Sequence, residues 1–166
     1  MLKGFCRKGY PLSLPDSTAA IEKYIERRGR EILDDGGRIF FVCDSHELTD
    51  PEINKPYPPH CLSGTVEAEI IDELQELAKN STILHKNTLS IFLNTELEKL
   101  IKEVNPELIE ITGVCTDICV LFAAYELRMR GYNIQVSRDG VLPLASESQD
   151  EFLEYFSKRL AVDIIS

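Results

Sequence analysis

Cys119 has the sequence context of a nucleophile. It lies in ITGVCTDICV, residues 111–120, where an apolar strand is predicted to turn into a helix that begins near Thr116 and Asp117. A thiol in the first turn of a helix lies near unpaired backbone N–H groups and the positive end of the helix dipole, which favour the thiolate. The same N–H groups could stabilise an oxyanion, so one turn could supply both the nucleophile and its stabiliser.

Two other interpretations of Cys119 remain open. The thiol could be an inert, buried residue of an apolar helix. It could also form a redox dithiol with Cys115, although the two cysteines lack the C-x-x-C spacing. The five cysteines are odd in number and lack the spacing of a small disulfide framework, so we expect them to be reduced.

Asp44, His46 and His60 could form a metal site. The segment CDSH places Asp44 and His46 on the same side of a predicted strand end, and His60 follows a long irregular loop of the kind that often carries function. Two imidazoles and one carboxylate leave open coordination positions and suit zinc, iron or manganese. The alternative is a capping aspartate beside two solvated histidines.

Lys86 ends the predicted strand STILHK, residues 81–86. Neighbours on a regular strand face opposite sides, so His85 and Lys86 cannot both point into one cleft. Taken alone, this position favours a lysine whose amine extends into solvent.

An alternation of helices and strands positions these residues. Helices are predicted after a cap at 15–17 as far as Gly36, and at 67–79, 95–104, 117–130 and 149–159; strands are predicted at 38–44, 81–86, 108–114, 132–137 and 161–165. Such alternation is typical of a three-layer, Rossmann-like α/β domain with a mainly parallel sheet. Ligands bind at the carboxyl ends of strands in these sheets, and the candidate residues follow strand ends.

Composition restricts the class of protein. With 166 residues, 43% hydrophobic and 28% charged, we expect a single globular domain over residues 1–166. Neither an apolar run of about 18 residues nor a secretory signal is found, which favours a cytoplasmic location. A formal charge of -10 argues against nucleic acid as a partner, because phosphate binding needs clustered basic residues.

Four segments together resemble the isochorismatase-like cysteine hydrolases, and among them the nicotinamidase/pyrazinamidase branch. ITGVCTDICV is similar to the family's G-V-x-T-[DN]-x-C-V nucleophile turn, and HKNTLSIF to its strand that ends in a catalytic lysine before a Ser-x-Phe element. CDSH and YPPHCLSGTVEAEI resemble the branch's D-x-H and W-P-x-H-C-x-x-G-T-x-G-A-E segments. The resemblance covers nearly the whole chain.

This resemblance implies roles for the residues around the thiol. Cys119 would be the nucleophile that forms a thioester with the substrate's acyl group, and the charge of Lys86 would support the thiolate. The backbone amides of Cys115 and Cys119 would form the oxyanion hole, shaped by a cis peptide bond between Val114 and Cys115.

The branch implies a ligand site as well. Asp44, His46 and His60 would hold a divalent metal that receives the ring nitrogen of a pyridine carboxamide. Phe5 and Tyr57 would be the aromatic walls, with Tyr57 standing where the branch usually has tryptophan.

The amino terminus departs from the family pattern. Family members begin with an apolar strand that ends in a general-base Asp and leads into M-L-x-x-F, whereas this sequence opens with MLKGF. That strand is central in the family order 3-2-1-4-5-6, and we expect it and its Asp to be missing here because the sequence starts at an internal methionine. Without it, two rows of backbone groups would be unpaired, at roughly 1–3 kcal/mol per buried group.

The resulting hypothesis is a nicotinamidase-like hydrolase of a small carboxamide, acting through a thioester and impaired in the chain as given. The alternatives are a metal-free family hydrolase acting on another small amide or a vinyl ether such as isochorismate, and a non-catalytic member that lacks the base. Expected partners are a small amide substrate and further copies of the chain in a homo-oligomer, with no nucleic acid and no membrane.

Overall fold

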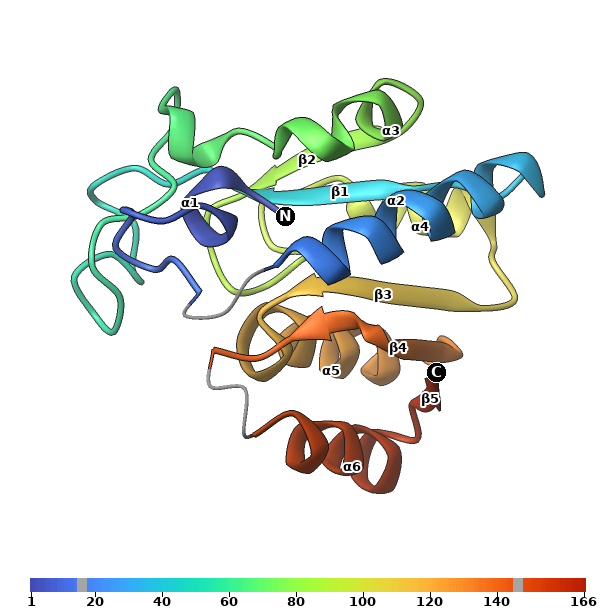
Figure 1. Ribbon diagram of the computed structural model, residues 1–166. Coiled ribbons are helices and arrows are strands. Elements are labelled where there is room, and N and C mark those ends of the chain that lie inside the picture. Colours follow the sequence, from blue (N-terminus) through green and yellow to red (C-terminus); the bar gives the residue numbers. More distant parts are fainter. Residues whose placement is uncertain (15–17, 145–147) are drawn as a thin grey trace.

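The strands of this protein lie in two parallel sheets. The computed structural model describes residues 1–14, 18–144 and 148–166 (Figure 1). The strands are β1 (Phe40–Asp44), β2 (Thr82–Lys86), β3 (Ile109–Val114), β4 (Ile134–Leu142) and β5 (Asp163–Ile165). The helices are α1 (Lys3–Cys6), α2 (Ala19–Asp34), α3 (Gln75–Lys79), α4 (Leu97–Val104), α5 (Leu121–Met129) and α6 (Gln149–Leu160).

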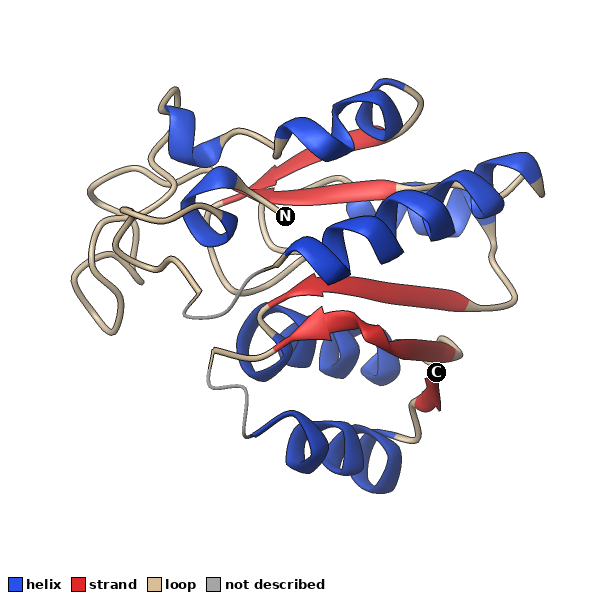
Figure 2. Ribbon diagram, in the orientation of Figure 1, coloured by secondary structure: helices blue, strands red, loops and turns tan. Residues whose placement is uncertain are grey.

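Strands β1 and β2 pair with each other, and β3, β4 and β5 form the second sheet in that order. Every pairing between these strands is parallel. In Figure 2 the strands of both sheets run in one layer between helices, and β1 and β3 are the facing strands of the two sheets. The family order 3-2-1-4-5-6 without its strand 1 gives one pair of strands and one group of three, which is the arrangement observed here.

Two hydrophobic cores cover the two faces of the strands. Residues Phe41 and Cys43 of β1 pack into the core that contains α2 and α3, whereas Phe40 and Val42 pack against the core of α4, α5 and α6. Burial on both faces explains why β1 is a continuous apolar run instead of an alternating one. The alternation of side chains along the strand decides which core each residue joins.

The prediction of a single helix over residues 67–79 is wrong. The segment instead contains two 3-10 turns, Val66–Ala68 and Asp72–Leu74, before α3. Between the turns, Ile70 forms an antiparallel bridge with Leu2, and the Ile71 N–H donates to the Met1 carbonyl at 3.3 Å. Pairing with the amino-terminal segment therefore replaces helical hydrogen bonds in the middle of this stretch.

Two further boundaries differ from those predicted. The helix expected at 117–130 starts with a π-helical turn, Thr116–Val120, and becomes α-helical only in α5. Strand β4 continues past 137 to Leu142, and at Gly140 a side chain would lie within 3.1 Å of the Tyr24 ring of α2, so the close packing of α2 favours glycine there. The cap predicted at 15–17 lies outside the described residues.

None of the helices in the described part of the chain combines the length and the apolar character that crossing a membrane requires.

Replacing Phe156 by alanine is expected to lower the free energy of unfolding by about 3–5 kcal/mol, because the Phe156 ring of α6 is fully buried and its removal leaves a cavity. Urea unfolding followed by circular dichroism measures the change. Tyr155→Ala, on the same helix but 49% exposed, is the matched control and should change the unfolding free energy by less than about 0.5 kcal/mol. Equal losses in the two variants would contradict this packing.

Candidate active site

A buried ion pair joins the carboxyl ends of β1 and β2. Asp44 and Lys86 are register partners in the parallel ladder, so both side chains project from the same face of the sheet. They form a salt bridge, and only 5% of Asp44 and 4% of Lys86 is exposed. Sequence position alone favoured a solvated Lys86, but the structure buries this amine and exposes His85 instead.

The partners of Lys86 keep it charged. Burial by itself would lower the pKa of the amine, but the Asp44 carboxylate, together with Cys119 and Glu52, outweighs burial and the pKa of Lys86 is raised. The amine also donates a hydrogen bond to the Thr88 carbonyl at 3.0 Å. A fixed positive charge therefore lies at this edge of the sheet.

Cys119 lies in the π-helical turn between β3 and α5 and lines the same cavity as Lys86. The peptide bond between Val114 and Cys115 is cis, as the resemblance implied, and the backbone of Cys115 forms a hydrogen bond with the Cys119 thiol. The thiol, an amide of the proposed oxyanion hole and the lysine charge therefore share one corner of the site.

The expectation of a thiol with a lowered pKa is not met. Burial and the charge of Asp44 raise the pKa of Cys119 to about 11, while Lys86 and the hydrogen bond from Cys115 act in the opposite direction. Residue 119 precedes the first residue of α5, Leu121, so it is not in the first turn of a regular α-helix. At neutral pH the thiol of the chain as described is mostly protonated.

The three predicted metal ligands lie together. One candidate ligand atom each from Asp44, His46 and His60 lies within 4.8 Å of the other two, and all three side chains are buried. The loop brings them together by a short parallel bridge, in which the His46 N–H donates to the Cys61 carbonyl at 3.0 Å and the Ser63 N–H donates to the His46 carbonyl at 2.9 Å.

The ring nitrogens of these histidines that lack a hydrogen-bond partner could bind a cation. His46 is fully buried, and its Nε2 has no hydrogen-bond partner, a costly state unless another group binds there. Its Nδ1 lies 3.4 Å from the Asp50 carboxylate. The His60 Nδ1 donates to the Pro58 carbonyl at 2.8 Å, which leaves the Nε2 lone pair available. This donor set suits a divalent transition metal.

The two predicted aromatic walls both lie near the second histidine. The rings of Phe5 and Tyr57 each lie 5.9 Å from the His60 ring, measured between centroids. Phe5 comes from α1 and Tyr57 from the loop before His60, so two segments distant in sequence bring aromatic rings to the same histidine. The structure thus brings together every residue that the sequence proposed for the site.

Two acidic residues of the loop were not predicted. Asp50 faces His46 and accepts a hydrogen bond from the Asn87 side chain at 3.0 Å, which fixes the loop to the end of β2. Glu52 is buried, and burial raises its pKa while Lys86 acts in the opposite direction. Its sequence context, among polar loop residues, carries no signal of burial.

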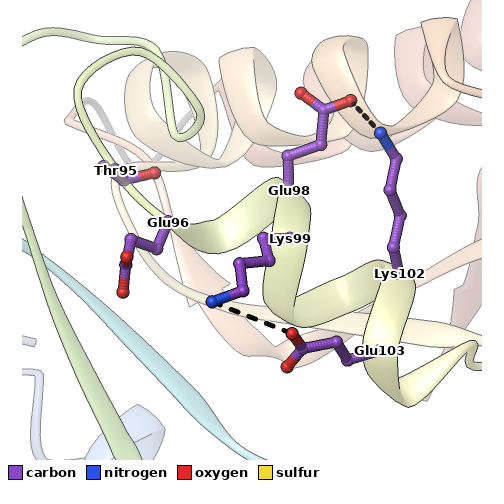
Figure 3. Close-up of a pocket in the computed structure, with 6 residues that line it drawn as sticks. All are labelled: Thr95, Glu96, Glu98, Lys99, Lys102 and Glu103. Carbon is purple, nitrogen blue, oxygen red and sulfur yellow. Dashed lines mark hydrogen bonds and ion pairs between the residues drawn. The ribbon is translucent and has the colours of Figure 1, made fainter.

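A second hollow, on the surface of α4, lacks such convergence. Its lining residues are Thr95, Glu96, Glu98, Lys99, Lys102 and Glu103 (Figure 3). Lys102 pairs with Glu98 at 2.8 Å and Lys99 with Glu103 at 3.9 Å, and all four side chains are well exposed. These are ordinary salt bridges one helical turn apart and they aim no free group at a ligand.

Sequence comparison finds a family model, described as the isochorismatase domain, that matches residues 1–165. An uncharacterized isochorismatase family protein of Bacillus subtilis, PncA, is 28% identical over 153 residues, which make up 87% of this chain and 83% of that protein. Nicotinamidase 1 of Arabidopsis thaliana is 30% identical over 148 residues, or 81% of this chain and 60% of the plant protein.

Solved structures share the fold. The crystal structure of nicotinamidase PncA from Bacillus subtilis has a TM-score of 0.90 at 26% identity and covers 99% of this chain and 94% of its own. The pyrazinamidase/nicotinamidase of Streptococcus mutans has a TM-score of 0.89 at 29% identity, with 99% and 95% covered. The pyrazinamidase of Pyrococcus horikoshii, solved in complex with zinc, has the same fold with a TM-score of 0.88 at 24% identity, with 100% and 94% covered.

His46→Ala is expected to abolish tight binding of zinc, because it removes the nitrogen that has no other partner. The measurement is the zinc content of the dialysed protein by elemental analysis, beside a titration calorimetry isotherm. His85→Ala, which removes an exposed histidine at the end of β2, should bind like the unaltered chain. Equal zinc binding by the two variants would place the metal elsewhere.

Alkylation of Cys119 by iodoacetamide should become about tenfold faster with each pH unit up to pH 10, since the thiolate is the reactive form and its pKa is about 11. Lys86→Gln removes a charge that lowers this pKa, so alkylation of Cys119 at pH 9 should slow. Peptide mass spectrometry follows each cysteine separately.

The exposed Lys79→Gln is the matched control for this variant. If Lys86→Gln unfolds the chain, all five cysteines will react faster, which separates unfolding from the charge effect. Alkylation of Cys119 that is already maximal at pH 7 would contradict the raised pKa.

Proposed function

The chain belongs to the isochorismatase family, and we propose that within it the protein is a cysteine-dependent hydrolase of a small, nicotinamide-like carboxamide. The observation that carries this proposal is the convergence of Cys119, the buried Lys86 and the Asp-His-His set at one edge of the sheet. The nicotinamidases among the similar proteins support the choice of an amide as substrate.

The proposed reaction begins when the Cys119 sulfur attacks the amide carbon. The carbonyl oxygen becomes an oxyanion that accepts hydrogen bonds from the backbone N–H groups of Cys115 and Cys119. Because Cys115 already bonds to the thiol, its amide lies next to the atom that attacks. The thiol proton leaves on the amide nitrogen, ammonia departs, and water hydrolyses the thioester to the acid and the free thiol.

Lys86 stabilises the thiolate during this sequence. Its charge is held by Asp44, and it opposes the two effects that raise the pKa of Cys119, burial and the Asp44 carboxylate. The thiol is activated only when the balance of these charges shifts, since its pKa of about 11 leaves little thiolate at neutral pH. Binding of a cation at Asp44 would reduce the carboxylate's effect on the sulfur.

Asp44, His46 and His60 would hold that divalent cation, zinc, iron or manganese. Held by these residues, such a cation would supply a Lewis acid for the ring nitrogen of the substrate. Phe5 and Tyr57, whose rings both lie near His60, would contact the aromatic ring of the substrate. Together these residues fix the amide relative to the thiol.

Among the described residues, no carboxylate serves as a dedicated proton acceptor for the thiol. Asp44 acts on the thiol most strongly of the carboxylates, and it is already paired with Lys86; Glu52 acts more weakly. We therefore expect slow turnover by the 166-residue chain. The raised pKa of Cys119 also favours the second candidate, a family member that binds the amide without cleaving it.

With zinc or manganese added, the chain is expected to release ammonia from nicotinamide, and Cys119→Ala should reduce the rate at least about a thousandfold because it removes the nucleophile. Cys6→Ala, which removes a thiol of α1, should leave the rate within about threefold. A coupled ammonia assay measures both. Release of ammonia that survives Cys119→Ala would overturn the mechanism.

Benzamide tests the role of the metal ligands in the same assay. It lacks the ring nitrogen, so the unaltered chain should prefer nicotinamide by at least about tenfold in kcat/KM. His46→Ala should lose this preference if the cation receives that nitrogen. Tight binding of nicotinamide without ammonia release would instead identify the non-catalytic candidate.

A further inference from the structure

Gln149 joins three elements of the fold at the start of α6. Its side-chain nitrogen donates hydrogen bonds to the carbonyls of Val141 at 3.0 Å and Arg138 at 3.3 Å, both in β4. Its side-chain oxygen accepts a hydrogen bond from the Thr116 hydroxyl at 3.0 Å. A glutamine amide has two N–H donors and one carbonyl oxygen, so every polar group of this side chain has a partner.

The three partners leave one orientation for the amide. Turned by half a rotation, its oxygen would face the two carbonyls of β4. A glutamate of the same length has no N–H to donate to these carbonyls, and a methionine neither donates nor accepts strongly. The chemistry of the three partners therefore specifies glutamine at this position.

Thr116 begins the turn that carries Cys119. It is the first residue of the π-helical segment Thr116–Val120, and none of it is exposed. A buried hydroxyl is costly unless it is paired, so the bond to Gln149 offsets the burial of this side chain. Cys115, whose backbone bonds to the Cys119 thiol, immediately precedes Thr116. A shift of Thr116 would therefore disturb the backbone on which the thiol depends.

The turn is supported from outside at its second residue too. π-Helical hydrogen bonding is rare and occurs mostly as single turns, frequently at functional sites. Within this turn the Val120 N–H donates to the Cys115 carbonyl at 3.0 Å. The Leu144 N–H donates to the Asp117 carboxylate at 3.0 Å. Asp117 thus anchors the turn to the chain beyond β4, while Thr116 anchors it to α6.

Helix α6 is a fixed platform for Gln149. Leu153 and Phe156 of this helix are buried in the same core as Val120, the last residue of the turn. Figure 1 shows α6 beside α5, the helix that continues the turn. The bond between Gln149 and Thr116 therefore ties the turn to a helix that packing already holds.

We propose that Gln149 is a positioning residue: through the Thr116 hydroxyl it holds the Thr116–Val120 turn, and with it the Cys119 sulfur, at the carboxyl end of β3. Its effect on catalysis rests on the proposed function, since only a hydrolase that uses Cys119 depends on where this sulfur lies. Its effect on the turn does not. Loss of the bond should loosen the turn, so a small reagent reaches the thiol more readily while a bound amide meets it less often in the attacking geometry.

Thr116→Val tests this bond, because it removes the hydroxyl, keeps the shape of the side chain and leaves the two bonds of Gln149 to β4. The Val120 amide should undergo hydrogen exchange at least about tenfold faster than in the unaltered chain. Amides of β2, in the other sheet, are the internal reference and should not change. Iodoacetamide at pH 8 should alkylate Cys119 at least about threefold faster, whereas the rate at the fully buried Cys61 should stay the same.

Further variants separate this bond from packing. Thr116→Ser keeps the hydroxyl and should exchange within about twofold of the unaltered chain. Gln149→Met keeps the length of the side chain and should loosen the turn; adding Thr116→Val to it should accelerate exchange no further, because both changes remove the same bond. Gln135→Met is the matched control, since it removes the bond of another β4-bound glutamine, to Glu110 at 2.8 Å, and should leave the turn unchanged.

With nicotinamide as substrate, Thr116→Val should lower kcat at least about tenfold and change KM by less than about twofold, because the thiol and not the ring site is displaced. A loosened turn with an unchanged kcat would overturn the effect on catalysis. If the unaltered chain releases no ammonia, that result counts against the proposed hydrolysis, and exchange and alkylation still decide the role of Gln149.

Three results would overturn that role. They are an unchanged Val120 amide in Thr116→Val, the same acceleration in Thr116→Ser or Gln135→Met, and faster exchange throughout the chain in both Thr116→Val and Gln149→Met.

Discussion

The ion pair between Asp44 and Lys86 is the interaction on which the rest of the site depends. Two charges buried at adjacent strand ends are tolerable only together, since removing one partner of a buried pair costs about 3–5 kcal/mol. The register of β1 and β2 puts both on one face, towards the turn that carries Cys119. The same carboxylate also belongs to the Asp-His-His set. A substitution of Asp44 or of Lys86 therefore changes the charge that surrounds the other residue of the ion pair.

This double role of Asp44 makes the reactivity of Cys119 conditional. In the chain as described, the carboxylate adds to burial in raising the pKa of the thiol, and the lysine only partly offsets them. A cation shared between Asp44, His46 and His60 would withdraw that negative charge from the sulfur. Metal binding and nucleophile activation are then two consequences of one electrostatic balance.

The division of the strands into two sheets affects how the site at the strand ends is held together. A parallel sheet positions ligands at its carboxyl edge only if its strands are held in register with one another. Here β1 and β2 carry the charges, whereas β3 leads to the thiol turn, and within residues 1–14, 18–144 and 148–166 the two groups of strands share no direct pairing. Helix α2, packed on both β3 and β4, and the two cores keep them aligned.

The sequence by itself determined the alternation of helices and strands, and it predicted which residues near the strand ends could carry chemistry, because these follow from local periodicity and short motifs. Only the tertiary structure decided that 67–79 is not one helix, that Glu52 is buried and that the pKa of Cys119 is raised, because each depends on partners distant in sequence. Ile70 and Ile71 pair with the amino-terminal segment, and the pKa of a thiol is the sum of burial and charges from several strands. Local pattern identifies the groups; three-dimensional packing sets their protonation and their neighbours.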